Sequence, residues 1–440
     1  MQWAENLDAL PECRCYHGFG GGACEEERNV CTNECSGRGK CKDSFCHCDV
    51  PYWGVGCARS RAYPPQNVSL ANPTNFKIYM YDLPAYVAYQ QGPSGWQGHD
   101  PIYIAYQYFL DSLIKSNVRT EDPSEAHLFF LPALTYAYTS NLGNPNLHVT
   151  RVVDYVREEF PYWNRTDGRD HIVWTPGDRS SCLLESPEAK SLIKLTHFGY
   201  FDHTAEGKNY SMVLNVPNKD WGCYHPLRDV NVPPFLPNGG RVARETYVER
   251  INSIERPLPD RKELFFFAGG FRPNDFEYSG RTRHIIAEYI PKWNDTDFRV
   301  VEGSIPDYEE TLRRTQFCLA PYGHGWGIRI VSIMSTGCVP VIIQEHVYQP
   351  YEDILPYEEF SIRLNNEDIP RLPSILRSIS PQQLAALQAG VAKYWPALIW
   401  EAEFGGKAFD YAILALRRRH IHLKSKYFGR HSADLFRKSS

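Results

Sequence analysis

The stretch FCLAPYGHGWGIRIVSIMSTGCVPVII, residues 317–343, carries the pattern that decides the fold. An apolar run ends before a turn with three glycines, and apolar residues at helical spacing follow until Gly337. A second apolar run, residues 339–343, comes next. The order predicts a buried strand, a glycine-rich turn, a helix over residues 327–336 and another buried strand, which is the repeating unit of a parallel α/β sheet. The glycines of the turn are Gly323, Gly325 and Gly327.

Similar apolar runs lie outside this stretch, and several are continuous, as expected of strands that are buried on both faces. Helical patterns occur at residues 307–315 and 381–395, and the second begins with a capping signature at Ser380 and Gln383. The predicted strands are residues 77–81, 127–132, 171–175, 212–216, 264–267 and 298–301.

This alternation of strands and helices extends over more residues than one core normally holds. We therefore predict an α/β protein with two doubly wound, Rossmann-like domains that face a cleft. The first would span residues 76–245 and the second residues 246–420, with a ligand in the cleft between them. Residues 421–440 would form a tail.

The N-terminal part has a different character. Nine of the 13 cysteines lie between Cys13 and Cys57, a density that favours disulfides and an oxidising compartment. We predict a small disulfide-rich module over residues 1–58 and a linker over residues 59–75, which contains Pro64, Pro65 and Pro73. The alternative is a zinc site with ligands such as Cys46 and Cys48.

From Cys31 to Cys57 the spacing C-x3-C-x5-C-x4-C-x-C-x8-C resembles an EGF-like repeat. The resemblance implies the pairs Cys31 with Cys41, Cys35 with Cys46 and Cys48 with Cys57. Upstream, Cys15 and Cys24 would pair, which leaves Cys13 without a partner, so we expect the natural protein to continue beyond Met1. The module would space the following domain or dock a protein partner.

Charge and hydropathy exclude several classes of function. The net charge of −5 gives no basic surface for nucleic acid or an anionic membrane. No apolar stretch reaches the roughly 18 residues of a membrane helix, and no signal peptide is evident at the start. Glycosylation sequons at Asn67, Asn164, Asn209 and Asn294 agree with the cysteines. We expect a protein of the Golgi lumen, with a type II membrane anchor upstream of this chain, or a secreted protein.

The glycine-rich turn also predicts chemistry. Backbone N–H groups at a strand-to-helix turn favour a diphosphate, and Arg329 would lie in the first helical turn, where its guanidinium can add two-pronged contacts. The alternative is an ordinary turn, with Arg329 in a surface ion pair. Asp295 and Asp297 form a D-x-D, which can bind a metal diphosphate, but their polar turn favours a structural role.

Six segments, in this order and spacing, resemble the exostosin-like glycosyltransferases. They are KIYMYDLP from Lys77, RTEDPSEAHLFFLP from Arg119, PYWNRTDGRDHIVWTPGD from Pro161, RDVNVPP from Arg228, LFFFAGG from Leu264 and the stretch from Phe317. The resemblance implies an inverting glycosyltransferase of type B, with a UDP-sugar donor, a glycan or glycoprotein acceptor and no obligatory metal or other cofactor. It also implies that the first domain lies on the acceptor side and that the second binds the nucleotide-sugar.

The resemblance also implies donor-site residues. It places Arg272 beside the donor diphosphate together with Arg329, and Arg283 is a third candidate. Where the family commonly has a glutamate for the ribose, this chain has Ser332, and Glu345 could take over part of that role. Asp178 is the candidate base, and the alternatives Asp82 and His171 stay open.

Two further expectations concern cysteines and aromatic residues. Adjacent parallel strands would bring Cys318 and Cys338 together in a disulfide, and the resemblance supports both positions. Cys182 and Cys223 would form a second bridge. The aromatic side chains Tyr103, Tyr106, Tyr108, Trp163 and Trp174 suit either stacking on an acceptor glycan or core packing. A non-catalytic, glycan-binding or adhesion protein on the same fold is the alternative to an active enzyme.

Overall fold

A computed structural model divides the chain into two compact units, Met1–Ala71 and Asn72–Ser440. It describes residues 19–20, 23, 25–27, 31–42, 45–49, 52–53, 57, 59–60, 75–88, 101–133, 145–175, 177–178, 180–184, 186–200, 224–236, 261–275 and 278–437, the last 14 of these by their backbone alone.

Short hairpins and disulfides build the first unit. Strands β3 (Gly39–Lys42) and β4 (Phe45–Cys48) pair antiparallel after the 3-10 helix η1 (Thr32–Gly37). Three disulfides join Cys31 to Cys41, Cys35 to Cys46 and Cys48 to Cys57, which confirms the predicted pairing. The sulfur atoms of Cys31, Cys35 and Cys46 lie close together, but all three are in disulfides, so they offer no thiolate to a metal. The other strands are β1 (Phe19–Gly20), β2 (Glu26–Glu27), β5 (Tyr52–Trp53) and β6 (Arg59–Ser60). Cys13, Cys15 and Cys24 lie outside the described residues.

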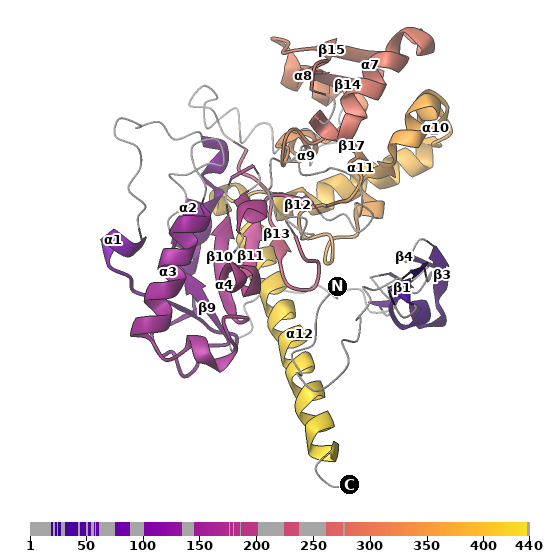
Figure 1. The fold of residues 1–440 in the computed structure, drawn as a ribbon. Coiled ribbons are helices and arrows are strands. Elements are labelled where there is room, and N and C mark those ends of the chain that lie inside the picture. The colour runs from indigo at the N-terminus through magenta and orange to yellow at the C-terminus, as the bar shows by residue number, and fades with distance from the viewer. Residues whose placement is uncertain are drawn as a thin grey trace. The chain divides into compact units, whose positions relative to one another are not determined.

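The second unit begins with a six-stranded parallel sheet, in the order β13-β11-β10-β9-β7-β8. Its central strands β9 and β10 are buried throughout, which explains their continuous apolar sequence. Helices α2, α3 and α4 flank this sheet (Figure 1). The strands are β7 (Ile78–Met80), β8 (Arg119–Thr120), β9 (Leu128–Leu131), β10 (His171–Thr175), β11 (Ile193–Thr196) and β13 (Val230–Asn231). The helices are α1 (Ala85–Ala88), α2 (Ala105–Lys115), α3 (Asn146–Glu159) and α4 (Pro187–Ser191). The predicted strand 212–216 lies outside the described residues.

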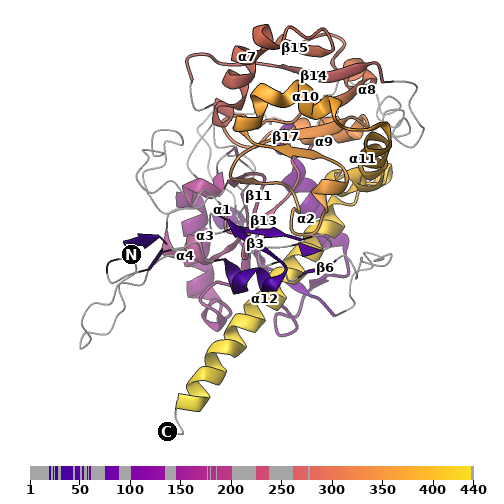
Figure 2. The same cartoon turned by 90° about the vertical axis from the view of Figure 1, so that its right-hand side faces the viewer.

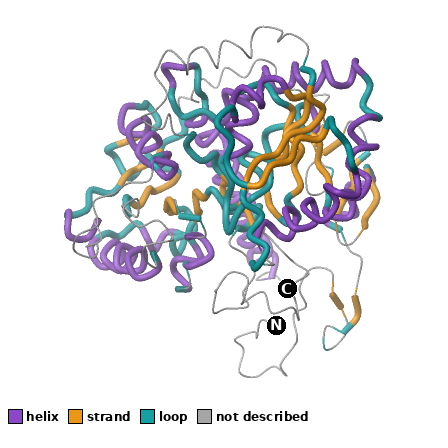
Figure 3. The backbone as a smooth tube through the Cα atoms, turned by 90° about the horizontal axis from the view of Figure 1, so that it is seen from above, coloured by secondary structure: helices purple, strands orange, loops and turns teal. Residues whose placement is uncertain are grey.

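A five-stranded parallel sheet follows, in the order β15-β14-β16-β17-β19. Helices surround it (Figures 2 and 3), so the predicted doubly wound α/β class is confirmed. The strands are β14 (Glu263–Gly269), β15 (Phe298–Glu302), β16 (Thr315–Leu319), β17 (Val339–Ile343) and β19 (Ile362–Leu364). The helices are α7 (Thr282–Trp293), α8 (Tyr308–Arg314), α9 (Arg329–Ser335), α10 (Leu372–Arg377) and α11 (Pro381–Tyr394), and α11 has the predicted capping box. Short 3-10 helices are η2 (Pro101–Tyr103), η4 (Trp163–Arg165), η5 (Ser180–Leu183), η6 (Tyr278–Arg281), η7 (Tyr357–Glu359), η8 (Asn366–Arg371), η9 (Trp395–Leu398) and η10 (Ala402–Phe404).

Elements near the C-terminus return to the first sheet of this unit. Strand β12 (Gly199–Tyr200) pairs antiparallel with β18 (Val347–Tyr348). The indole of Trp400 donates a hydrogen bond of 2.9 Å to the carbonyl of Pro233. In helix α12 (Ala408–Arg437), the Nε atom of Arg419 donates one of 3.0 Å to the carbonyl of Asp229. These contacts attach the C-terminal elements to the segments beside β11 and β13.

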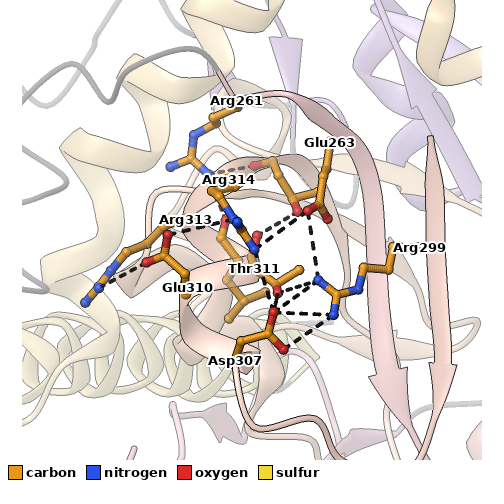
Figure 4. A network of polar contacts seen from close by, with 10 residues as sticks. Arg261, Glu263, Arg299, Asp307, Glu310, Thr311, Arg313 and Arg314 are labelled. Carbon is orange, nitrogen blue, oxygen red and sulfur yellow. Dashed lines mark hydrogen bonds and ion pairs between the residues drawn. The ribbon is translucent and has the colours of Figure 1, made fainter. Parts of the chain in front are cut away.

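A polar network occupies the amino ends of the strands in the second sheet (Figure 4). The half-buried guanidinium of Arg261 donates to the carbonyls of Leu312, Thr315 and Thr336 at 2.6–2.9 Å, and loss of solvent contact lowers its pKa to about 10. Arg299 contacts Asp307, at the start of α8. Because these contacts are all internal, the amino ends of the strands are engaged in structural roles.

Candidate donor-binding site

The topology of the second sheet indicates where a ligand would bind. After β14 the chain first adds β15 on one side and then β16 on the other, so the strand order reverses between β14 and β16. In doubly wound sheets, ligands bind outside the carboxyl ends of the strands at this reversal. The segment with Arg272 follows β14, and the glycine-rich turn follows β16. The fold therefore brings the two predicted donor-site segments to one edge.

The glycines of the turn lie where the backbone is closely approached. A Cβ atom on Gly325 would lie 2.1 Å from the carbonyl oxygen of Asp178, and one on Gly327 would lie 2.9 Å from the carbonyl oxygen of Pro321. The Gly323 N–H donates to the Gly325 carbonyl at 3.1 Å. Helix α9 begins at Arg329, two residues after the predicted start at Gly327.

Arg329 lies across the end of strand β14. Its Nη2 atom donates a hydrogen bond of 2.6 Å to the carbonyl of Ala268, and its guanidinium lies 5.2 Å from the ring centre of Phe267. Gly269 leaves room for this, since a Cβ there would lie 2.3 Å from the same Nη2 atom. Arg329 forms no ion pair with any described residue, so the alternative of a surface ion pair is wrong for this part of the chain.

Arg283, in the first turn of α7, is buried and binds backbone and phenol groups. It donates to the carbonyls of Gly270 (3.0 Å) and Tyr322 (2.9 Å) and to the hydroxyl of Tyr278 (2.9 Å). Gly270 follows β14 and Tyr322 follows β16. Arg283 thus ties together the two segments that form the candidate site.

Arg272 is exposed and has a positive φ of 50°. Its guanidinium lies 4.7 Å from the ring centre of Tyr278, and its Nη1 atom lies 3.2 Å from Nδ1 of His324, in the glycine-rich turn. A left-handed conformation is costly for a residue with a side chain and often marks functional segments. Here it occurs directly after β14.

The three arginines form a cluster of positive charge. Burial, followed by the charges of Arg329 and Arg272, lowers the pKa of Arg283 to about 10. None of the three has an ion-pair partner among the described residues. Uncompensated guanidinium groups that lie close together repel one another, and a bound anion relieves this repulsion. The arrangement therefore suits a diphosphate, which two guanidinium groups can bind from different sides.

Asp178 lies beside the same turn, on a segment that follows β10. Its Oδ1 atom accepts a hydrogen bond of 2.7 Å from the hydroxyl of Tyr103, whose ring meets that of Trp326 edge-on at 5.4 Å. A carboxylate offers several acceptor positions on its two oxygens, so a hydrogen bond from a tyrosine does not by itself exclude one from a substrate hydroxyl. Asp178 is thus the predicted base candidate that the structure brings to the glycine-rich turn.

The two alternatives for the base have different environments. His171 is fully buried, with its ring nitrogens 2.8 Å from Asp170 and from the hydroxyl of Tyr81, and burial lowers its pKa. It belongs to the core. Asp82 is exposed after strand β7.

The remaining predicted residues lie in helix α9, after β17 and in the turn before β15. Ser332 is half-buried in α9, one helical turn after Arg329. Glu345 follows β17 and accepts a hydrogen bond of 2.7 Å from the Asn366 N–H. Among the described residues, Glu345 forms no hydrogen bond or ion pair with an arginine of the cluster. Asp295 and Asp297 both contact Arg377, in agreement with a structural role.

His324, Asp275 and Tyr278 lie beside the arginines, although the sequence pattern did not predict them as site residues. His324 contacts Arg272 and Asp275, and its ring meets that of Tyr278 edge-on at 5.0 Å. One feature of the sequence could have identified His324: it is a titratable residue between two glycines of a turn that was expected to bind phosphate.

The disulfide predictions have separate outcomes. Cys318 and Cys338 are joined, with Cα atoms 6.0 Å apart, which confirms the bridge behind the glycine-rich turn. Cys182 is disulfide-bonded, and its predicted partner Cys223 lies outside the described residues.

Among the described helices, none is long and apolar enough to cross a membrane.

Two doubly wound parallel sheets, with a glycine-rich turn and three arginines at the carboxyl edge of the second, form the α/β architecture expected of a glycosyltransferase of type B. A family model, the exostosin GT47 domain, matches residues 72–379. The chain belongs to this family of glycosyltransferases, as the six sequence segments predicted.

Curated relatives agree with this assignment. A probable glucuronosyltransferase of Oryza sativa subsp. japonica is 27% identical over 366 residues, which cover 80% of this chain and 82% of the relative. A probable glycosyltransferase of Arabidopsis thaliana is 30% identical over 332 residues, or 72% of this chain and 57% of the relative. A probable β-1,4-xylosyltransferase of Arabidopsis thaliana is 25% identical over 367 residues, which cover 80% of this chain and 83% of the relative.

Among solved structures, Anabaena HepE in complex with UDP aligns with 80% of this chain and 100% of its own, with 9% identity and a TM-score of 0.33. A likeness of this size carries no argument about the site.

Proposed function

We propose that this protein is an inverting transferase that moves a sugar from a UDP-sugar to a glycan or glycoprotein acceptor, with no obligatory metal. The single observation that carries the proposal is the cluster of Arg272, Arg283 and Arg329, which has no carboxylate partner among the described residues. This arginine cluster lies at the carboxyl ends of the strands, where the strand order of the second sheet reverses.

In this proposal, Arg272 and Arg329 bind the diphosphate from two sides. The N–H groups between Gly323 and Gly327 add backbone donors. As the bond between the anomeric carbon and the diphosphate oxygen breaks, negative charge grows on the leaving UDP. Guanidinium groups fixed beforehand stabilise that charge more in the transition state than in the ground state. Arg283, which is bound to two carbonyls, holds the two loops in place and contributes its charge.

Asp178 acts as the base. Its carboxylate accepts the proton of the acceptor hydroxyl while that oxygen attacks the anomeric carbon from the face opposite to UDP, so the configuration is inverted. Tyr103 orients the carboxylate through the 2.7 Å hydrogen bond. Ser332 and Glu345 are proposed to contact the donor ribose, in place of the family's glutamate.

The names of the relatives suggest a donor. Two of the proteins reported above are described as a glucuronosyltransferase and a xylosyltransferase. We propose UDP-glucuronic acid or UDP-xylose as the donor and a cell-wall or matrix glycan as the product. The disulfides fit the secretory pathway, and we propose the Golgi lumen as the site of action, with the cysteine-rich module available to a protein partner.

A donor panel tests the proposal. The purified chain would be incubated with UDP-linked glucuronic acid, xylose, galactose and arabinose and a set of glycan acceptors, with UDP release and product mass as readouts. The chain with Arg272 and Arg329 both changed to Ala is the inactive control. Transfer from one donor that the control lacks would support the proposal, whereas no transfer and no UDP binding would contradict it.

Ser332 favours a second candidate, a glycan-binding protein without activity on the same fold, because one hydroxyl grips a ribose less firmly than a carboxylate. Glycan binding without UDP binding or UDP release in the same panel would favour this candidate.

A further inference from the structure

Three side chains from two different loops form a chain of hydrogen bonds beside the arginine cluster. Arg272 and Asp275 belong to the loop after β14, and His324 lies in the glycine-rich turn after β16. Nη1 of Arg272 lies 3.2 Å from Nδ1 of His324, and Nε2 of His324 contacts Oδ2 of Asp275. His324 therefore links the two loops, in addition to the contacts of Arg283.

The chemistry of the partners fixes the form of the imidazole. A guanidinium has only donors, so Nδ1 of His324 must accept the hydrogen bond from Arg272. A carboxylate is an acceptor, so Nε2 carries the proton and donates a hydrogen bond to Asp275. These contacts are compatible with one state of His324, the neutral tautomer with its proton on Nε2.

The surroundings hold this arrangement in place. The Asp275 N–H donates a hydrogen bond of 2.9 Å to the carbonyl of Arg272. This bond closes a tight turn and brings the Asp275 carboxylate towards His324. Nε2 of His284 donates to the same carbonyl at 2.9 Å. The ring of Tyr278 lies against both Arg272 and His324. Yet Arg272 itself is exposed and sits on a left-handed backbone, so His324 is the one side chain that gives its guanidinium a directional hydrogen bond among the described residues.

We propose that His324 is a positioning residue for the donor site: its neutral imidazole connects Arg272 to Asp275 and holds the guanidinium where the donor diphosphate binds. The proposal rests on the function proposed above, since it assigns Arg272 to the diphosphate. A guanidinium held in one orientation loses less conformational entropy when the anion arrives. His324 thus acts through Arg272, without contact with the reacting atoms.

Two substitutions separate the two hydrogen bonds of the ring. In His324→Asn the carboxamide oxygen lies close to the former Nδ1 position and can still accept from Arg272. In His324→Gln the longer side chain reaches the Nε2 position and can contact only Asp275. We expect His324→Gln and His324→Ala to weaken UDP binding, measured by calorimetry, by about tenfold, the loss of one charge-assisted hydrogen bond. His324→Asn should remain within about threefold of the natural chain. Thermal unfolding of each variant checks the fold.

A double-mutant cycle provides the decisive readout. If His324 acts through Arg272, His324→Ala should weaken UDP binding in the natural chain but have no further effect in the Arg272→Ala variant. Equal losses in both backgrounds, or unchanged UDP binding in His324→Ala, would overturn the positioning role. Unchanged UDP binding in Arg272→Ala itself would instead show that the donor site has been placed wrongly, so the two failures can be told apart.

Discussion

Gly325 packs directly against the backbone of Asp178, since a Cβ atom at position 325 would lie 2.1 Å from the Asp178 carbonyl oxygen. This contact joins the glycine-rich turn of the second sheet to the loop that carries the proposed base. Gly325→Ala should therefore displace both segments and cost about 2 kcal/mol of stability, together with most of the activity. Gly323→Ala is the matched control, because its nearest neighbour would lie at an ordinary 3.7 Å. Equal melting temperatures for the two variants would contradict the contact.

The role of Asp178 predicts a loss of rate without a loss of donor binding. In Asp178→Asn the carboxamide keeps a partner for Tyr103 but cannot accept the acceptor's proton. We expect kcat to fall by about 100-fold or more, with UDP affinity within about twofold of the natural chain. Asp82→Asn serves as the control, because Asp82 is exposed after β7. A normal rate in Asp178→Asn would remove it as the base.

The Cys318–Cys338 disulfide should stabilise the region behind the donor site. It closes a loop of 20 residues around α9, and both cysteines are fully buried. Loss of the bridge in the Cys318→Ala, Cys338→Ala double variant should lower the free energy of unfolding by about 3 kcal/mol. Denaturant unfolding measures this loss. Peptide mapping without reduction should recover the two cysteines linked, and a free thiol at either position would contradict the bridge.

Glu401 predicts a dependence of stability on pH. Its side chain is buried before α12, and burial raises its pKa from 4.5 to about 7. Between these values the folded chain keeps the proton that the unfolded chain has released, so the free energy of unfolding falls as the pH rises. Glu401→Gln cannot ionise and should be more stable than the natural chain at pH 8 by about 2 to 3 kcal/mol, with little difference at pH 4.5.

The control for this prediction is Glu302→Gln, because Glu302 is exposed at the end of β15 and is not among the charges that raise the pKa of Glu401. Its melting temperature should follow that of the natural chain at both pH values. A Glu401→Gln variant that melts with the natural chain at pH 8 would show that the carboxyl group ionises freely in the folded protein.

The sequence predicted those parts of the fold whose signal is local. The strands at 171–175 and 339–343 are buried on both faces, so their apolar runs gave their bounds to the residue. Strands β11 and β13 escaped prediction, because β11 includes the buried polar residues Lys194 and Thr196 and β13 has only two residues. Lys194 is tolerated inside because it lies 3.8 Å from the buried carboxylate of Asp229, and a contact between residues so far apart in sequence has no local pattern.

The candidate site shows the same limit. The glycine-rich turn and Arg329 were predictable, because one short segment contains both. The link from Arg272 through His324 to Asp275 depends on two loops that follow different strands, and the order of strands in the sheet determines which loops meet. The 2.7 Å contact of Tyr103 with Asp178 likewise joins residues 75 positions apart.

The central claim is that Arg329 and Arg272 bind the donor diphosphate, and UDP titration of Arg329→Ala tests it most directly. Calorimetry would compare this variant with the natural chain, with Arg329→Lys and with Arg371→Ala, an arginine on the surface that pairs with Asp368. We predict that Arg329→Ala weakens UDP binding by at least about tenfold, that Arg329→Lys recovers part of the loss and that Arg371→Ala has no effect. Unchanged UDP affinity in a folded Arg329→Ala variant would contradict the account.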